Sequence, residues 1–87
     1  MFAISEVKAP MTGEVGSIHA QVGMKVRGGD ILMTLEAMKM ENLIRAPRSG
    51  VVIEILTTEG AMVHAGEILA VLDEALRGAQ GPLEGEQ

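Results

Sequence analysis

The chain of 87 residues has room for one small domain, because a chain of this length buries only about 60% of its unfolded surface. It has no cysteine, which excludes disulfides and thiolate metal sites, and its net charge of −5 argues against nucleic acid and anionic membranes as partners. No apolar run approaches the roughly 20 residues that span a bilayer, and residues 1–7 do not resemble a signal peptide, so we expect a cytoplasmic protein without membrane insertion.

Short apolar runs rich in β-branched residues alternate with glycine-containing segments along the chain. Runs of about five residues bounded by glycine predict strands separated by turns. The predicted strands cover residues 2–8, 15–20, 31–36, 41–45, 51–56 and 68–73. Val15 and Ile18 are the core residues expected of the second strand, and residues 21–30 and 57–67 are predicted as glycine loops, the first anchored by Val26. With helix nearly absent, the pattern indicates an all-β sandwich or flattened barrel.

The chain contains an internal repeat, in which residues 7–35 align with residues 44–72 at a constant offset of 37 positions without a gap. The two copies share an Ala-Pro dipeptide, three glycines and an Ile-Leu dipeptide. Each copy is expected to be a unit that cannot bury its apolar face alone, and two copies are too few for a solenoid. We therefore expect one closed domain with approximate two-fold symmetry, with the segment between the copies near the symmetry axis.

That segment contains Lys39, one of three lysines in the chain. Lys8 aligns with Arg45 and Lys25 with Met62, so both other lysines belong to the repeat. Lys39 lies between two predicted strands, which places it at the tip of a hairpin. Tight hairpin turns usually contain glycine, asparagine or aspartate, and none is present here. We therefore predict a turn whose ordinary residues adopt positive φ, with local strain of order 1–3 kcal/mol, as is often seen at functional positions.

The segment Glu36-Ala37-Met38-Lys39-Met40-Glu41 resembles the attachment motif of the biotinyl domain, the biotin carboxyl carrier protein family within the biotinyl/lipoyl attachment superfamily. Residues 9–13, 23–30 and 46–50 are also similar to this family, so the resemblance covers residues 7–73. It implies a flattened barrel (barrel-sandwich hybrid) of two four-stranded antiparallel sheets. It also implies a domain over residues 1–75, followed by a disordered tail over residues 76–87.

The resemblance implies that Lys39 carries biotin. A biotin protein ligase joins biotin to the Lys39 amine as an amide, which an exposed amine on a flexible stem allows. The resulting swinging arm visits a biotin carboxylase, which carboxylates the biotin with ATP and bicarbonate, and a carboxyltransferase. That second enzyme passes the carboxyl group to or from an acyl-CoA, as in acyl-CoA carboxylase, or an oxo acid. The acceptor is a property of the partner enzymes.

Around Lys39 the resemblance assigns further site residues. Met38 and Met40 are expected to contact the ligase and the partner sites, where flexible thioethers suit several surfaces. Ala37 and Glu36 complete the expected site. Glu36 and Glu41 are explained equally well by ligase recognition and by solubility. We find no catalytic residues and no metal site, so the domain is expected to be a non-catalytic carrier; His19 and His64 lack metal-ligand spacing.

Two alternatives use the same fold. A lipoyl carrier also presents a modified lysine at a hairpin, but such domains usually resemble Asp-Lys-Ala at the tip, whereas this chain has Met-Lys-Met. An unmodified barrel could instead serve as a binding module, in which case Lys39 is replaceable without consequence. The interval from Val15 to Glu36 also has no room for the protruding thumb loop of some bacterial carriers.

Overall fold

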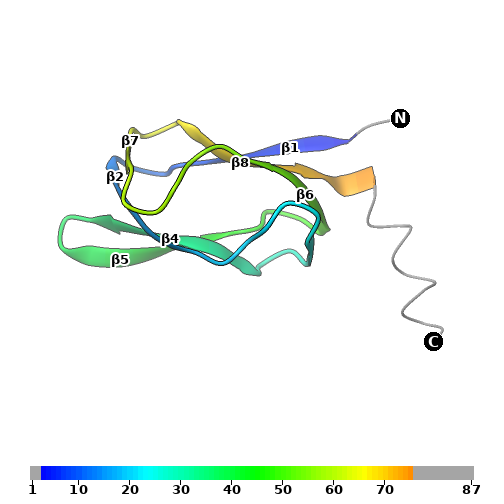
Figure 1. The fold of residues 1–87 in the computed structure, drawn as a ribbon, viewed down its shortest axis with the longest axis horizontal. Coiled ribbons are helices and arrows are strands. Elements are labelled where there is room, and N and C mark those ends of the chain that lie inside the picture. Colours follow the sequence, from blue (N-terminus) through cyan, green and yellow to red (C-terminus); the bar gives the residue numbers. More distant parts are fainter. Residues whose placement is uncertain (1–2, 76–87) are drawn as a thin grey trace.

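The computed structural model describes residues 3–75, and these form an all-β domain (Figure 1). Its strands are β1 (Ile4–Lys8), β2 (Gly13–Ile18), β3 (Lys25–Val26), β4 (Ile31–Ala37), β5 (Met40–Arg45), β6 (Gly50–Ile55), β7 (Met62–Val63) and β8 (Ile68–Asp73). Within the described residues there is no helix long and apolar enough to cross a membrane. The predicted disordered tail, residues 76–87, lies outside the described part of the chain.

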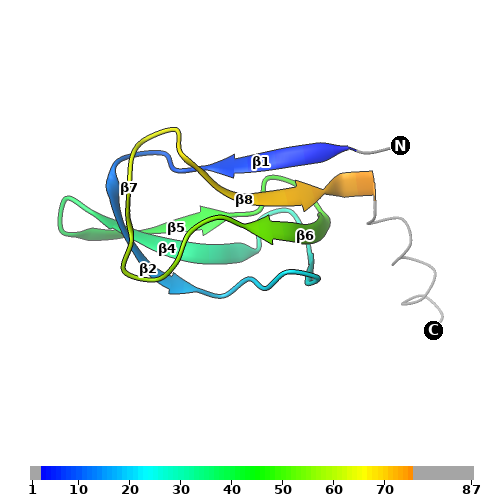
Figure 2. The ribbon, with the colours of Figure 1, turned by 45° about the horizontal axis from the view of Figure 1, so that its top comes forward.

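The strands form two four-stranded antiparallel sheets, stacked as two layers (Figures 1 and 2). The terminal sheet has the order β1-β8-β6-β3, and the hairpin sheet has the order β5-β4-β2-β7. Each of the six expected strands is present, and the expected fold class is confirmed. Adding 37 to the residue numbers carries β1, β2, β3 and β4 onto β5, β6, β7 and β8, so the sequence repeat is also the approximate two-fold symmetry of the structure.

Backbone hydrogen bonds repeat with the same offset. Ala9 N–H donates to the Glu67 carbonyl at 2.9 Å, and Ala46 N–H donates to the Asp30 carbonyl at 2.8 Å. Gly29 and Gly66 each turn the chain before the last strand of their copy, with φ of 95° and 89°. These angles lie in the region that only glycine adopts readily. The glycine repeat therefore marks two equivalent turns.

The cluster of buried side chains between the sheets is aliphatic apart from the thioether of Met33. The largest side chains with almost no exposed surface are Leu32, Met33, Leu35, Leu69, Leu72, Val15, Val52 and Val63. The expected core residue Val15 belongs to this set, while Ile18 packs against it only partly buried. Because β-branched and leucine side chains from the two layers interdigitate, residues 3–75 form a closed core without phenylalanine, tyrosine or tryptophan.

The two glycine loops were predicted without strands, and this was wrong. Each contains a two-residue strand, β3 or β7, that extends one sheet at its edge. Val26 in β3 and Val63 in β7 point into the core, at 5% and 1% exposure. A pair of residues is too short to show the alternation that reveals a strand in a sequence. The prediction of Val26 as the buried anchor of its loop was correct.

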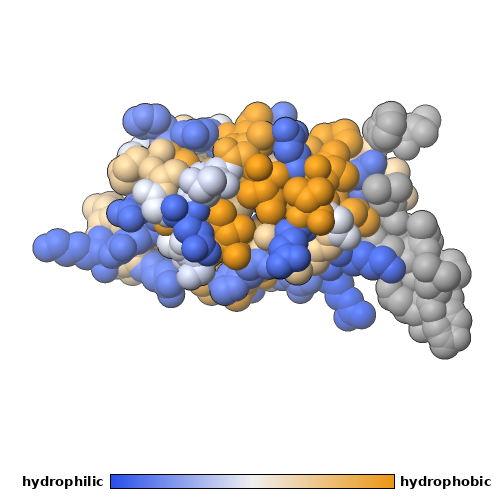
Figure 3. Space-filling view, in the orientation of Figure 1, coloured by the Kyte–Doolittle hydropathy of each residue, from blue (hydrophilic) through white to orange (hydrophobic). Residues whose placement is uncertain are grey.

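The outer surfaces of the two sheets differ at symmetry-related positions. Ile4 and Val51 of the terminal sheet correspond to Glu41 and Glu14 of the hairpin sheet. Apolar surface gathers over β6 and β8 (Figure 3), where Ile53 remains 39% exposed. The same backbone thus accepts apolar or acidic side chains at equivalent sites, and the fold does not require either.

The hairpin and the ends of the described chain lie at opposite ends of the molecule (Figure 1). Ile4 in β1 pairs with Asp73 in β8 at one end. The connection between β4 and β5 projects at the other end (Figures 1 and 2). A group attached to the hairpin is therefore remote from Ile4 and Asp73, near the two ends of the described chain.

Candidate functional site

The β4–β5 hairpin turns through two residues. Ala37 pairs with Met40, and Met38 and Lys39 between them have φ of 55° and 63°. Two central residues with positive φ match a type I′ turn, which suits the twist of the strands but normally takes Asn-Gly. The predicted hairpin tip with ordinary residues at positive φ is confirmed. Strain of order 1–3 kcal/mol per residue is thus held at this turn by the pairing of the flanking strands.

The side chains at the tip extend into solvent. Met38 is 89% exposed and Met40 is 66% exposed, which is unusual for residues as apolar as methionine. Lys39 is also exposed and makes no hydrogen bond or ion pair with any of residues 3–75. A primary amine on a flexible stem is therefore presented at the end of the molecule with an apolar neighbour on each side.

Below the tip the hairpin is held tightly. Ala37 is 6% exposed and packs inward at the end of β4. A methyl group on Gly13 of β2 would lie 2.5 Å from the carbonyl oxygen of Glu36, so only glycine permits this close approach of the strands. The Asn42 side-chain amide donates to the carbonyls of Leu35 and Met40, each at 3.3 Å. The strained turn therefore has a well-anchored base.

A row of carboxylates crosses the sheet beside this base. Glu14 of β2 pairs with Glu36 of β4, and Glu36 pairs with Glu41 of β5. All three side chains are exposed. Like charges directly opposite one another in a sheet destabilise it modestly, and solvent weakens the effect further. The row is a negative surface adjoining the cationic side chain of Lys39.

The structure brings most of the predicted site residues together. Met38, Lys39 and Met40 form the tip, and Glu36 flanks its base. Ala37 lies in the interior, where its side chain packs beneath the turn. His19 and His64 are exposed, and residues 3–75 contain no group of three or more side chains able to hold a metal ion.

Sequence reasoning missed three residues near Lys39. Thr12, Glu14 and Met62 line an open depression of about 400 Å³ together with the hairpin. Glu14 reaches this place because β2 pairs with β4, and Met62 because β7 pairs with β2. The register of these pairings was the missing information, since the two-residue strand β7 is not visible in the sequence.

Comparison with known proteins identifies the family. The family model described as "Biotin-requiring enzyme" matches residues 4–72. The chain belongs to this family. The expected membership and the expected cofactor, biotin, are thereby confirmed, and the match includes the whole hairpin and both copies of the repeat.

Individual relatives agree with this assignment. Pyruvate carboxylase of Aspergillus terreus is 42% identical over 71 residues, which cover 82% of this chain and 6% of the relative. The solved structure of a single-chain, multi-domain long-chain acyl-CoA carboxylase matches with a TM-score of 0.78 at 31% identity, over 82% of this chain and 7% of that one. This chain is a biotin carrier domain of the carboxylase type, and it spans less than a tenth of these proteins.

A lipoyl domain has the same architecture. The lipoyl domain of the 2-oxoglutarate dehydrogenase complex from Azotobacter vinelandii matches with a TM-score of 0.68 at 32% identity. The match covers 80% of this chain and 95% of that domain. The fold is therefore shared by biotinyl and lipoyl domains, and the side chains at the hairpin must distinguish between them.

Proposed function

We propose that Lys39 is the residue to which biotin is attached, and that the domain carries a carboxyl group between a biotin carboxylase and a carboxyltransferase. The observation that supports this most strongly is the hairpin itself. It presents an exposed amine, without a partner in the described part of the chain, at a strained two-residue turn between Met38 and Met40. The relatives are carboxylases with pyruvate or acyl-CoA in their names.

The chemistry of attachment requires little from this chain. The Lys39 nitrogen, once deprotonated to the neutral amine, attacks the carbonyl carbon of a biotin carboxyl group that a biotin protein ligase has activated. The activating group leaves with a carboxyl oxygen, and the nitrogen gives up a second proton and keeps one hydrogen in the neutral amide. Bound biotin supplies a ureido nitrogen able to accept and release a carboxyl group. The exposed tip lets a ligase reach Lys39, and the well-anchored base keeps the strained turn in one conformation during that encounter.

We infer that the domain itself is non-catalytic. Its role is to position a tethered group, which raises the local concentration of biotin at two separate active sites. Exposed thioethers at Met38 and Met40 can adapt to the different surfaces of a ligase, a carboxylase and a carboxyltransferase. The acceptor, whether an acyl-CoA, an oxo acid or urea, is selected by the carboxyltransferase.

Mass spectrometry tests the attachment. The full chain is co-expressed with a biotin protein ligase and biotin, and its intact mass and peptide map are measured. We expect one biotinyl increment, located at Lys39. Lys39→Arg should abolish it while the melting temperature stays unchanged, because Lys39 makes no hydrogen bond or ion pair with residues 3–75 that the substitution could remove. Lys8→Arg is the matched control and should be labelled fully.

The same experiment separates the alternatives. Incubation with a lipoyl ligase and lipoate should leave the mass unchanged, since the tip is Met-Lys-Met. A lipoyl increment, or the absence of both increments from folded protein, would overturn the proposal. Persistent biotin on Lys39→Arg would show that another residue is the acceptor.

A further inference from the structure

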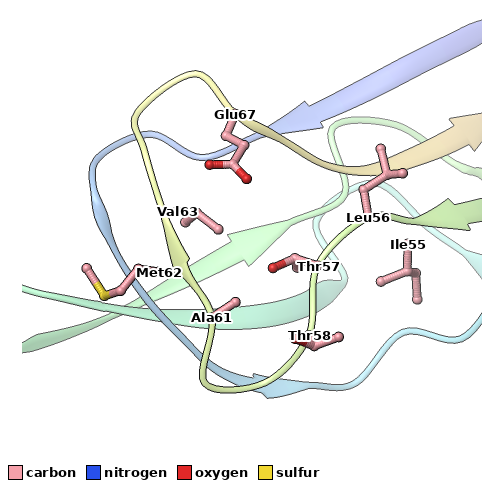
Figure 4. A pocket seen from close by; sticks show the side chains of 8 residues that line it. All are labelled: Ile55, Leu56, Thr57, Thr58, Ala61, Met62, Val63 and Glu67. Carbon is pink, nitrogen blue, oxygen red and sulfur yellow. The ribbon is translucent and has the colours of Figure 1, made fainter.

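Two surface depressions meet at Met62. The first, of about 400 Å³, extends from Lys39 across the ends of β4 and β2 and includes Thr12, Glu14 and Met62. The second, of about 370 Å³, lies under the chain between β6 and β7 (Figure 4). Met62 lies at the edge of the second depression that adjoins β2, and it is 64% exposed. It is thus an apolar surface beside the proposed attachment residue.

The internal repeat shows that the fold does not require an apolar residue at this position. The symmetry-related residue of Met62 is Lys25, in the equivalent two-residue strand β3. The valines that follow them, Val26 and Val63, are both buried and serve the core. Because the backbone is the same in both places, the exposed methionine beside the hairpin needs an explanation other than folding.

We propose that the depression between the hairpin and Met62 is a resting site for the head group of biotin attached to Lys39. This inference rests on the proposed attachment. The sulfur-containing ring of biotin is apolar and suits the flexible Met62 thioether. Its ureido group has two N–H donors and one carbonyl acceptor, and it therefore needs both kinds of polar partner nearby.

The depression supplies both partners. The carboxylates of Glu14 and Glu36 line it, are exposed, and can accept hydrogen bonds from the ureido N–H groups. The Thr12 hydroxyl oxygen accepts a bond from Ala65 N–H at 3.3 Å, which leaves its own proton able to donate to the ureido carbonyl. An electrically neutral head group suits this site, whereas one with negative charge would be repelled by the two carboxylates.

The tether is long enough for this arrangement. Met62 lies two strands from Glu36, because β7 pairs with β2 and β2 with β4, so the separation across the sheet is roughly 10 Å. A biotinyl-lysine arm of roughly ten covalent bonds, each about 1.5 Å long, exceeds that distance. Tethering also gives the head group an effective concentration of order millimolar at the site. A weak site is then occupied in the free domain, yet gives up the biotin to a partner enzyme.

NMR spectroscopy of the full chain tests the resting site. Biotinylation is first verified by intact mass, and a missing increment overturns the attachment itself, with the inference that depends on it. With the increment present, amide and methyl spectra of the modified and unmodified forms are compared. We expect shifts at Thr12, Glu14 and the Met62 methyl group as well as at the hairpin, and nuclear Overhauser contacts between biotin and that methyl. Shifts confined to residues 38–40 would overturn the inference while leaving the attachment established.

Matched variants provide the second measurement. Met62→Thr keeps a residue suited to a strand but removes the thioether, and it should reduce the biotin-dependent shift of the Thr12 amide at least two-fold. Met24→Thr is the control, because Met24 is 38% exposed beside β3 of the other sheet, and it should leave that shift unchanged. An unaltered Thr12 shift in biotinylated Met62→Thr would exclude Met62 from the site.

Discussion

Ala37 and Met40 face each other across the β4–β5 hairpin with only Met38 and Lys39 between them, and both of these turn residues have positive φ. Neither residue is stable in that conformation by itself, because a side chain at positive φ crowds its own backbone. The hairpin therefore holds an unfavourable turn through the pairing on either side of it. Its chemistry and its stability place opposite demands on the same two positions.

The first prediction concerns this strain. Met38→Asn should raise the free energy of unfolding by about 0.5–1 kcal/mol, because asparagine tolerates positive φ and is favoured in type I′ turns. Urea denaturation of the unmodified protein measures the change. Met40→Asn is the matched control and should bring no gain, since Met40 is a strand residue. Equal stability of Met38→Asn and the parent protein would show that the turn is not strained.

The second prediction concerns the close approach at Gly13. Gly13→Ala should lower the free energy of unfolding by about 2–4 kcal/mol, because the added methyl would lie 2.5 Å from the Glu36 carbonyl and 3.1 Å from the Ala37 side chain. Gly28→Ala serves as the control: its methyl would lie 3.4 Å from its nearest neighbour, an ordinary contact. Thermal denaturation should separate the two variants clearly. Similar melting temperatures would contradict the packing described here.

The third prediction concerns the carboxylate row. Glu36→Gln should stabilise the unmodified protein by about 0.2–1 kcal/mol at low salt, because it removes the middle of three like charges in register. The gain should shrink as salt rises to 1 M, where the Debye length is about 3 Å. Glu54→Gln is the control, since Glu54 pairs with Val71 and not with a carboxylate. A gain that does not depend on salt would point to a cause other than repulsion.

The fourth prediction uses the repeat. Asp30 accepts a hydrogen bond from Arg27 N–H at 2.8 Å, and its symmetry mate Glu67 accepts one from His64 N–H at 2.9 Å. Asp30→Ala and Glu67→Ala should therefore each cost about 1 kcal/mol, and the double variant about twice that. Chemical denaturation of the three variants checks the sum. A large difference between the two single variants would show that the copies, though alike in backbone, are not energetically equivalent.

Much of this structure could be predicted because the same signals occur twice. The offset between copies located the hairpin at Lys39, where local propensity alone would not have placed a turn, and the structure has the turn there. Strands longer than five residues, such as β4 and β8, carry enough apolar residues to be recognised. The tip residues could be assigned because they are consecutive in the sequence.

What could not be predicted depends on register between strands. The alignment of Glu14, Glu36 and Glu41 joins residues from three strands, and no pattern within any one strand reveals it. Met62 approaches the hairpin through β7, a strand of two residues in which Val63 is buried. Pairing across the sheet is a tertiary effect, and a one-residue change in register would have placed these side chains on the opposite face.

The two-fold symmetry also bears on how many groups such a domain can carry. The symmetry mate of the β4–β5 hairpin would be a turn from β8 to β1. These two strands are neighbours in the terminal sheet, but along the chain they are the last and the first strand. A linear chain leaves that second turn open. The described domain consequently has the Lys39 hairpin at one end and the two ends of the described chain at the other, where a larger polypeptide would connect to it (Figure 1). Topology thus leaves one hairpin of this kind among residues 3–75, and with it one proposed attachment site.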